Sequence, residues 1–200
     1  MMRAAAWLLP LTLLAGVPIP AQAHLVNSGL GPFYNGALHL LLSPVDLLAV
    51  VVMSLLAGQS GKVGGRWAAI VLPLVWGGAA IAGLTLGTAI EAGWPGVALL
   101  VLLGVLVALG LRLPVWVMTW LSALTGLVLG LENGGALAAG ESSFVAVAGI
   151  VATVLVLTLL TAALAVSLRA DWTRIALRVA GSWIAAVGML MLGWLFQGAS

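Results

Sequence analysis

Long runs of apolar residues, separated by short polar or glycine- and proline-rich stretches, dominate the sequence. A helix needs about 20 predominantly apolar residues to cross a hydrocarbon core of about 30 Å. Most of the runs reach that length, and the third and fourth are at its short end. The pattern therefore predicts an all-α polytopic membrane protein with about six transmembrane helices. The predicted segments are residues 36–58, 67–90, 94–111, 114–131, 142–168 and 173–197.

The start of the chain has the features of a secretory signal. A basic residue, Arg3, precedes an apolar run, two prolines end that run, and Ala21-Gln22-Ala23 matches the small-x-small cleavage pattern. This arrangement predicts a cleavable signal peptide over residues 1–23, with His24 as the mature N-terminus. The remainder, residues 24–200, is predicted to be one transmembrane helical domain. The alternative is an uncleaved first helix with the same orientation.

The composition supports a lipid environment for most of the surface. Of 200 residues, 64% are hydrophobic and 6% are charged, whereas a soluble domain carries about 25% charged residues. The nine tryptophans fit anchoring at membrane interfaces. The basic residues are scattered rather than clustered, so nucleic acid is not an expected partner. Since the chain has no cysteine, disulfides and thiolate metal sites are excluded.

The distribution of charge predicts an orientation. Connections between the segments alternate in charge, and one set carries all the basic residues that follow the signal. By the positive-inside rule, this set faces the cytoplasm, which places the protein in a bacterial inner membrane with both mature termini outside. The basic set is Lys62, Arg66, Arg112, Arg169, Arg174 and Arg178, and the acidic set is Glu91, Glu132 and Glu141.

The first segment contains a signal for a new helix. Ser43 is a favourable cap, Pro44 suits the first helical position, and Asp46 suits the positive end of a helix. We therefore expect a break at Ser43-Pro44. The piece after the break has about 15 residues and a length of about 22 Å, so it is too short to span alone. A continuous helix is the alternative, and it would place His39, Ser43 and Asp46 on one face.

These polar residues are the candidates for chemistry. A carboxylate such as Asp46 at membrane depth costs about 2.5–3.5 kcal/mol on insertion scales. With the imidazole of His39 it would suit a divalent metal such as nickel or zinc, or a proton relay. The structural alternative is that Asp46 caps backbone amides and His39 lies in the external headgroup region.

Two further residues join this hypothesis. Glu132 is expected to close the fourth helix near His39, or else to be an ordinary loop acid. His24, as a mature N-terminus, would chelate a metal through its amine and imidazole, or else be a flexible terminal residue. Tight helix packing is predicted at two glycine pairs, Gly83 with Gly87 and Gly126 with Gly130, because glycine four residues apart lets a neighbouring backbone approach.

The stretch from Gly29 to Leu47 resembles the HupE/UreJ family of hydrogenase and urease accessory membrane proteins, regarded as nickel or cobalt permeases. The family motif His-Pro-x-x-Gly-x-Asp-His is matched at His39 and Asp46, with one extra residue between them. Leu40 and Leu47 stand where that motif has proline and the second histidine.

A second family pattern, His-Gly-x-x-His-Gly-x-Glu, is similar to residues 125–132. Gly126, Gly130 and Glu132 match it, while Thr125 and Leu129 replace its histidines. The chain therefore looks like a divergent member of the family. The resemblance implies a helical membrane protein that handles nickel or cobalt as a transported ion, with no tightly bound cofactor.

Two functions follow as hypotheses. The first is a small transporter for a divalent metal cation, nickel- or cobalt-like, with a polar path past His39, Asp46 and Glu132. The second is a non-transporting membrane scaffold for maturation of a metalloenzyme such as hydrogenase or urease, acting as a homo-oligomer or with a maturation partner. An enzyme is not expected, since Gly-x-Ser-x-Gly and His-Glu-x-x-His are both absent from the sequence.

Overall fold

The computed structural model describes residues 29–87, 93–138, 143–168 and 170–197. Over these ranges the chain forms helices joined by short connections, which confirms the all-α prediction there. The predicted signal peptide and His24 lie outside the described residues. The helices are α2 (Pro32–Leu42), α3 (Pro44–Gln59), α4 (Lys62–Leu86), α5 (Trp94–Ala108), α6 (Val115–Ala138), α7 (Phe144–Ser167) and α8 (Asp171–Gln197).

Among the described helices, α4, α6, α7 and α8 are each long and apolar enough to cross a membrane. Helices α2 and α3 pass the same test together, bent by 76° at their junction, and so have the form of a fifth span that is broken or re-entrant. Helix α5 has 15 residues, or about 22 Å at 1.5 Å per residue. By length the structure thus supports up to five spans, and a sixth through α5 stays a prediction.

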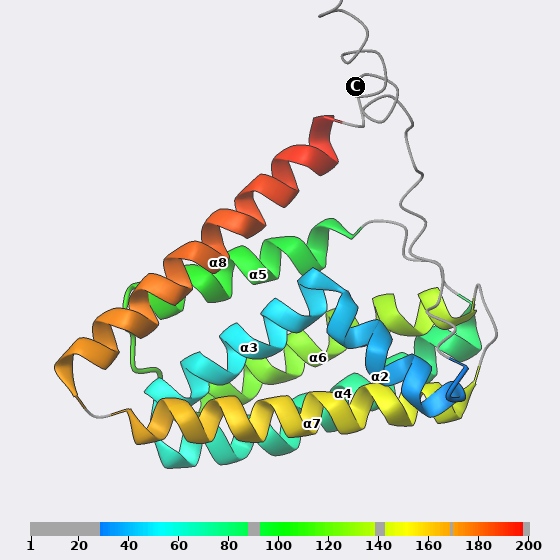
Figure 1. Cartoon of the computed structure of the whole chain (residues 1–200), viewed down its shortest axis with the longest axis horizontal. Coiled ribbons are helices and arrows are strands. Elements are labelled where there is room, and N and C mark those ends of the chain that lie inside the picture. Colours follow the sequence, from blue (N-terminus) through cyan, green and yellow to red (C-terminus); the bar gives the residue numbers. More distant parts are fainter. Residues whose placement is uncertain (1–28, 88–92, 139–142, 169, 198–200) are drawn as a thin grey trace, which may run out of the picture.

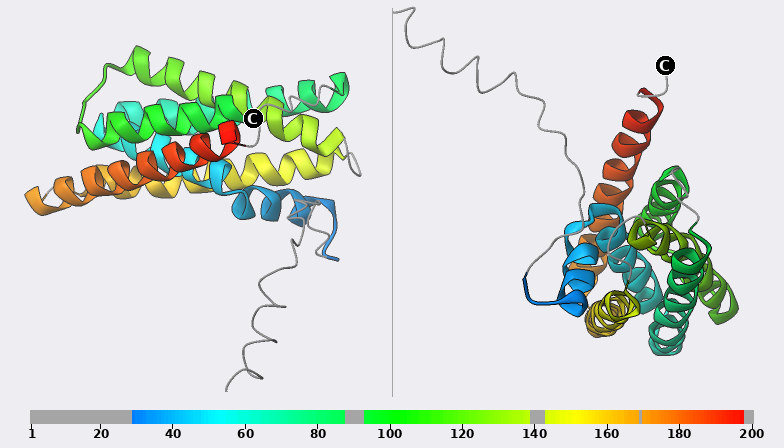
Figure 2. Two further views of the ribbon diagram at one scale, coloured as in Figure 1. Left: turned by 90° about the horizontal axis from the view of Figure 1, so that it is seen from above. Right: turned by 90° about the vertical axis from the view of Figure 1, so that its right-hand side faces the viewer.

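Helix α3 lies at the centre of the bundle, where it contacts α4, α5 and α7. The most extensive contact joins α4 to α6, while α5 packs on α8 and α2 packs on α7. Figure 1 shows α5 and α8 diverging from α4, α6 and α7, with α3 between the two groups. The views in Figure 2 show the same bundle from above and from one end. Every long helix therefore has one face in the protein and another free for lipid.

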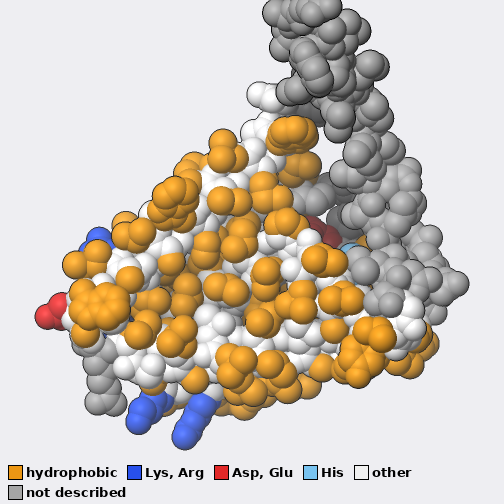
Figure 3. Space-filling model, in the orientation of Figure 1, with side chains coloured by type: hydrophobic (Ala, Val, Ile, Leu, Met, Phe, Trp, Pro, Cys, Tyr) orange, Lys and Arg blue, Asp and Glu red, His pale blue; other side chains and the backbone are white. Residues whose placement is uncertain are grey.

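The outer surface is apolar over most of the bundle. Large side chains such as Trp120 on α6 and Trp183 and Trp194 on α8 are 70–81% exposed. Figure 3 shows hydrophobic side chains covering the face in view, whereas lysine and arginine gather toward one end. Since an exposed apolar surface of this extent is not stable in water, the chain is a multi-pass membrane protein.

The tight contact between α4 and α6 depends on glycine. A Cβ on Gly126 would lie 2.9 Å from the backbone oxygen of Leu72, and one on Gly130 would lie 2.6 Å from that of Trp76. Gly83 approaches the backbone oxygen of Leu131 in the same way, at 2.6 Å from its ideal Cβ position. The two helices can pack this closely because these positions carry no side chain.

Gly87 does not join that contact, contrary to the sequence-based expectation. It ends α4 with a φ of 60° in the left-handed region, and no atom lies within 4 Å of its ideal Cβ position. Its role is that of a helix terminator, because glycine adopts this conformation without steric penalty.

Helix α6 differs most from the expectation. The sequence predicts a short fourth segment, residues 114–131, that Glu132 closes, but α6 runs through Glu132 to Ala138. Asn133 and two following glycines are poor helix formers. They remain helical because they are buried; Gly134 packs directly against the backbone of Ala80 on α4. Glu132 therefore projects from within a transmembrane helix rather than closing one.

Candidate functional site

The helix break between α2 and α3 creates the site. Ser43 has an extended backbone, with φ −81° and ψ 109°, and its Oγ accepts a hydrogen bond of 3.5 Å from the backbone N–H of Asp46. Pro44 occupies the first turn of α3, where its missing N–H is not needed. The sequence predicts a break at this dipeptide, and the two helices do end and begin there. The break turns the start of α3 into the bundle.

Asp46, in the first turn of α3, is the buried acid of the site. Its side chain is 4% exposed, and its Oδ2 accepts a hydrogen bond of 3.1 Å from Nδ2 of Asn133 on α6. Asn133 is itself 4% exposed. A buried carboxylate needs such donors because it has lost its hydration. The pair therefore fixes α6 to the break in the first span.

Glu132, the neighbour of Asn133, reaches a third helix. Its Oε1 accepts a hydrogen bond of 3.3 Å from the backbone N–H of Gly96 in the first turn of α5, where the helix dipole favours a negative charge. A Cβ on Gly96 would lie 2.7 Å from Glu132 Oε2, so glycine leaves room for the carboxylate. Glu132 and Asp46 also interact electrostatically. Glu132 thus links α6 to the start of α5, and Asn133 links α6 to the start of α3.

His39 lies in the last turn of α2 and is half-buried. Its imidazole is close enough to the Asp46 carboxylate for the two groups to interact electrostatically. In the part of the chain that the structure describes, no group of three histidine, cysteine, aspartate or glutamate side chains is arranged to hold a metal ion. The metal roles of His39, Asp46 and Glu132 stay predictions, and His24 is outside the described residues.

Asn133 and Gly96 are site residues that sequence reasoning missed. The available signal was an asparagine that follows an acid in an otherwise apolar helix, because a polar amide at membrane depth needs a partner. Within the described residues, Oδ1 of Asn133 is buried and has no hydrogen-bond partner. Asn133 thus carries an unpaired buried amide oxygen while its nitrogen donates to Asp46.

An apolar groove lies beside the site. Its volume is about 450 Å³, and its lining comes from the starts of α3 and α5 and the end of α8. Val45 and Val97, which line it, each adjoin a site residue in the chain. An apolar lining of this kind suits a lipid chain and offers no ligands to a hydrated cation.

Of the remaining charged residues, Asp171 is exposed at the start of α8, far along the chain from the site. Glu91 and Glu141, which were assigned to external connections, lie outside the described residues. The described basic side chains are separate from the site: Lys62 and Arg66 open α4, Arg112 lies between α5 and α6, and two arginines lie in α8.

The chain is similar in sequence to a known protein family. The family model described as HupE / UreJ protein matches residues 11–191. Neither the curated proteins nor the solved structures contain a match to the chain. The family match covers nearly the whole sequence, including both glycine-rich contacts and the broken first span. The chain therefore belongs to the HupE/UreJ family.

Proposed function

We propose that the protein is a small permease for a divalent metal cation of the nickel and cobalt class, with Asp46, Glu132 and His39 along its substrate path. The observation that carries this proposal is the buried Asp46 at a helix break, hydrogen-bonded to Asn133. Transporters form ion sites from discontinuous helices at this kind of position.

Electrostatics favour a cation at the site. Asp46 and Glu132 are near enough to interact, and when both are ionised they repel each other more strongly in a low-dielectric interior than in water. A cation between them would offset that repulsion. The unpartnered Oδ1 of Asn133 adds a neutral oxygen ligand, and oxygen ligands suit hard or borderline divalent cations.

A nitrogen ligand in the site would give it a preference for nickel or cobalt over magnesium. Among the residues that the structure describes, His39 can supply this nitrogen, because imidazole suits nickel better than it suits magnesium. His24, as a mature N-terminus on the outer side, would capture metal at the entrance. The family's association with nickel and cobalt points to the same ions.

Uptake of labelled nickel, cobalt and zinc by cells that express the chain tests the proposal. Asp46→Asn keeps the size of the side chain and removes its charge, so we expect uptake to fall to the background of cells without the protein. Asp171→Asn, which removes an exposed acid elsewhere, is the matched control and should transport normally. Normal uptake by Asp46→Asn at equal expression would refute the assignment.

A non-transporting scaffold for metalloenzyme maturation is the second candidate. Two observations favour it. The described residues offer no group of three metal-binding side chains, and the Asp46–Asn133 hydrogen bond also has a purely structural use. The scaffold hypothesis predicts that a second protein co-purifies with the chain at endogenous expression and that no ion flux accompanies it. Purification of the chain alone under those conditions would count against it.

A further inference from the structure

A cleft opens at the end of the bundle opposite to the start of α2. Its volume is about 820 Å³, and it is bounded by the ends of α3, α5 and α7 and the starts of α4 and α8. Four basic residues line it, and none of its lining residues is acidic. We call it the basic cleft; its charged lining is Lys62, Arg112, Arg174 and Arg178.

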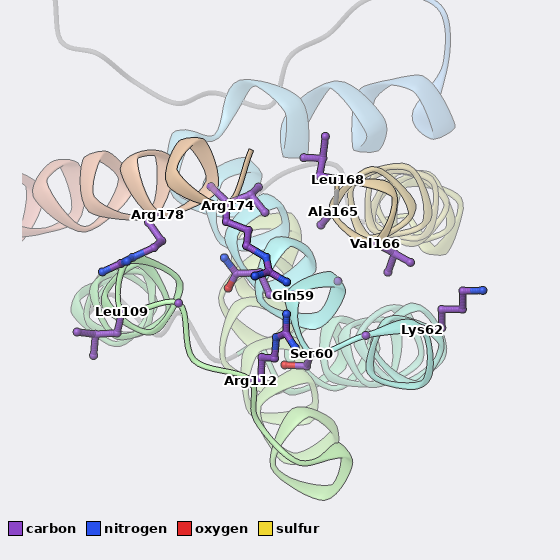
Figure 4. Close-up of a pocket in the computed structure, with 14 residues that line it drawn as sticks. Gln59, Ser60, Lys62, Leu109, Arg112, Ala165, Val166, Leu168, Arg174 and Arg178 are labelled. Carbon is purple, nitrogen blue, oxygen red and sulfur yellow. The ribbon is translucent and has the colours of Figure 1, made fainter. Parts of the chain in front are cut away.

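Two of these cations face the same space. Figure 4 shows the guanidinium groups of Arg112 and Arg174 pointing toward each other, with Gln59 beside them, whereas Lys62 points away. Arg178 is engaged elsewhere, since its Nε donates a hydrogen bond of 2.9 Å to the backbone oxygen of Ala108. Like charges that converge without an acid form a site for an anion.

The position of Arg112 is fixed by the fold. The next residue, Leu113, donates its backbone N–H to Oγ of Ser60 at 3.1 Å. Ser60 Oγ in turn donates to the backbone oxygen of Leu56 at 3.0 Å. The connection between α5 and α6 is thereby attached to the end of α3, and Arg112 is held over the cleft rather than left on a free loop.

Gln59 adds an unsatisfied polar group. Its Oε1 is buried and has no hydrogen-bond partner among the described residues. The oxygen and nitrogen of a side-chain amide exchange places by a half-turn, so Gln59 can present either a donor or an acceptor to a ligand. Planar guanidinium groups bind phosphate oxygens in pairs, and an amide N–H can supply a further donor.

We propose that the basic cleft binds a phosphate-bearing anion between Arg112 and Arg174. The apolar part of the lining, which includes Leu109, Val166 and Leu168, suits the glycerol and upper acyl chain of an anionic phospholipid. Cationic pockets between transmembrane helices bind such headgroups. A soluble phosphate compound shares the same recognition chemistry. The inference does not depend on the proposed transport of metal.

Native mass spectrometry of the purified full chain tests this site. The probes are dioleoyl phosphatidylglycerol and tetraoleoyl cardiolipin, with dioleoyl phosphatidylcholine as the zwitterionic reference. Inorganic phosphate is added separately in thermal-unfolding measurements. Arg112→Gln and Arg174→Gln remove one charge each, and Arg66→Gln removes one outside the cleft lining. The double variant Arg112→Lys with Arg174→Lys keeps both charges and checks that the fold survives.

We expect Arg112→Gln and Arg174→Gln each to weaken binding of anionic lipid about tenfold, the effect of one lost charge-assisted contact, and Arg66→Gln to have no effect. If phosphate stabilises the protein and lipids do not, and the two variants abolish that stabilisation, the ligand is a soluble phosphate compound. The proposal is overturned if anionic and zwitterionic lipids bind equally and phosphate has no effect, or if Arg66→Gln weakens binding as much as Arg112→Gln.

Discussion

At Asp46 one carboxylate accepts a hydrogen bond from Asn133 and interacts electrostatically with Glu132 and His39. The hydrogen bond attaches α6 to the broken span, and the proposed function adds a second use for Asp46, attraction of a cation. Thermodynamic measurements can separate them, because the structural use depends on Asn133, whereas attraction of a cation depends on charge.

A double-mutant cycle measures the structural use. Asp46→Ala, Asn133→Ala and the double variant are compared by reversible unfolding in detergent micelles. We expect a coupling free energy of about 0.5–2 kcal/mol, since polar contacts between transmembrane helices have this magnitude. A second cycle that pairs Asn133→Ala with Asp171→Ala should show additive effects. If the effects of Asp46→Ala and Asn133→Ala simply add, the hydrogen bond between these residues contributes nothing to the free energy of unfolding.

At the scale of single residues, the sequence identifies part of the site. Asp46 and Glu132 are visible as acids in or beside apolar segments. The pairing with Asn133 is not, because the partners are 87 positions apart on helices whose relative rotation depends on packing. The spacing of residues within one helix predicts contacts three or four positions apart, but it does not predict a contact between two helices.

At the scale of the helices, the broken span and the glycine contacts position the site. Local chemistry is sufficient to predict the break, since Ser43, Pro44 and Asp46 are three signals for a helix start within four residues. The length of α6 is not predictable in that way. Asn133 and the glycines after it disfavour a helix by intrinsic propensity, and burial against α4 outweighs that preference.

Substitution at Gly130 tests the contact between α4 and α6. A Cβ there would meet the backbone oxygen of Trp76 at 2.6 Å, whereas at Gly78 no atom lies within 4 Å. We expect Gly130→Ala to reduce the free energy of unfolding by about 1–3 kcal/mol, the usual effect of overpacking. Gly78→Ala should be neutral or stabilising, because alanine favours a helix over glycine. Equal stabilities of the two variants would show that the close approach is not required.

At the scale of the whole molecule, basic residues are concentrated at one end, together with the exposed Asp171. The described lysine and arginine residues lie at one end, at the starts of α4 and α8 and between α5 and α6, and the acidic site is associated with the start of α3 and the α2–α3 break. The positive-inside rule predicts that the basic end faces the cytoplasm, and under the proposed function the site would then be reached from the outside.

Cysteine labelling tests this orientation without background, because the natural chain has no cysteine. Thr85 near the end of α4 and Leu109 after α5 are both exposed. In intact spheroplasts a membrane-impermeant maleimide should label Thr85→Cys, while Leu109→Cys should react only after the membrane is permeabilised. The opposite pattern would reverse the proposed orientation.

The most direct test of the central claim is metal influx into proteoliposomes that contain only the purified chain. Nickel and cobalt entry is followed with a trapped fluorescent chelator for the wild type, Asp46→Asn and Asp171→Asn. The account predicts influx with the wild type and with Asp171→Asn, and its loss with Asp46→Asn. Equal influx with Asp46→Asn would contradict the role of the buried carboxylate, and no influx with the correctly folded wild type would favour the scaffold.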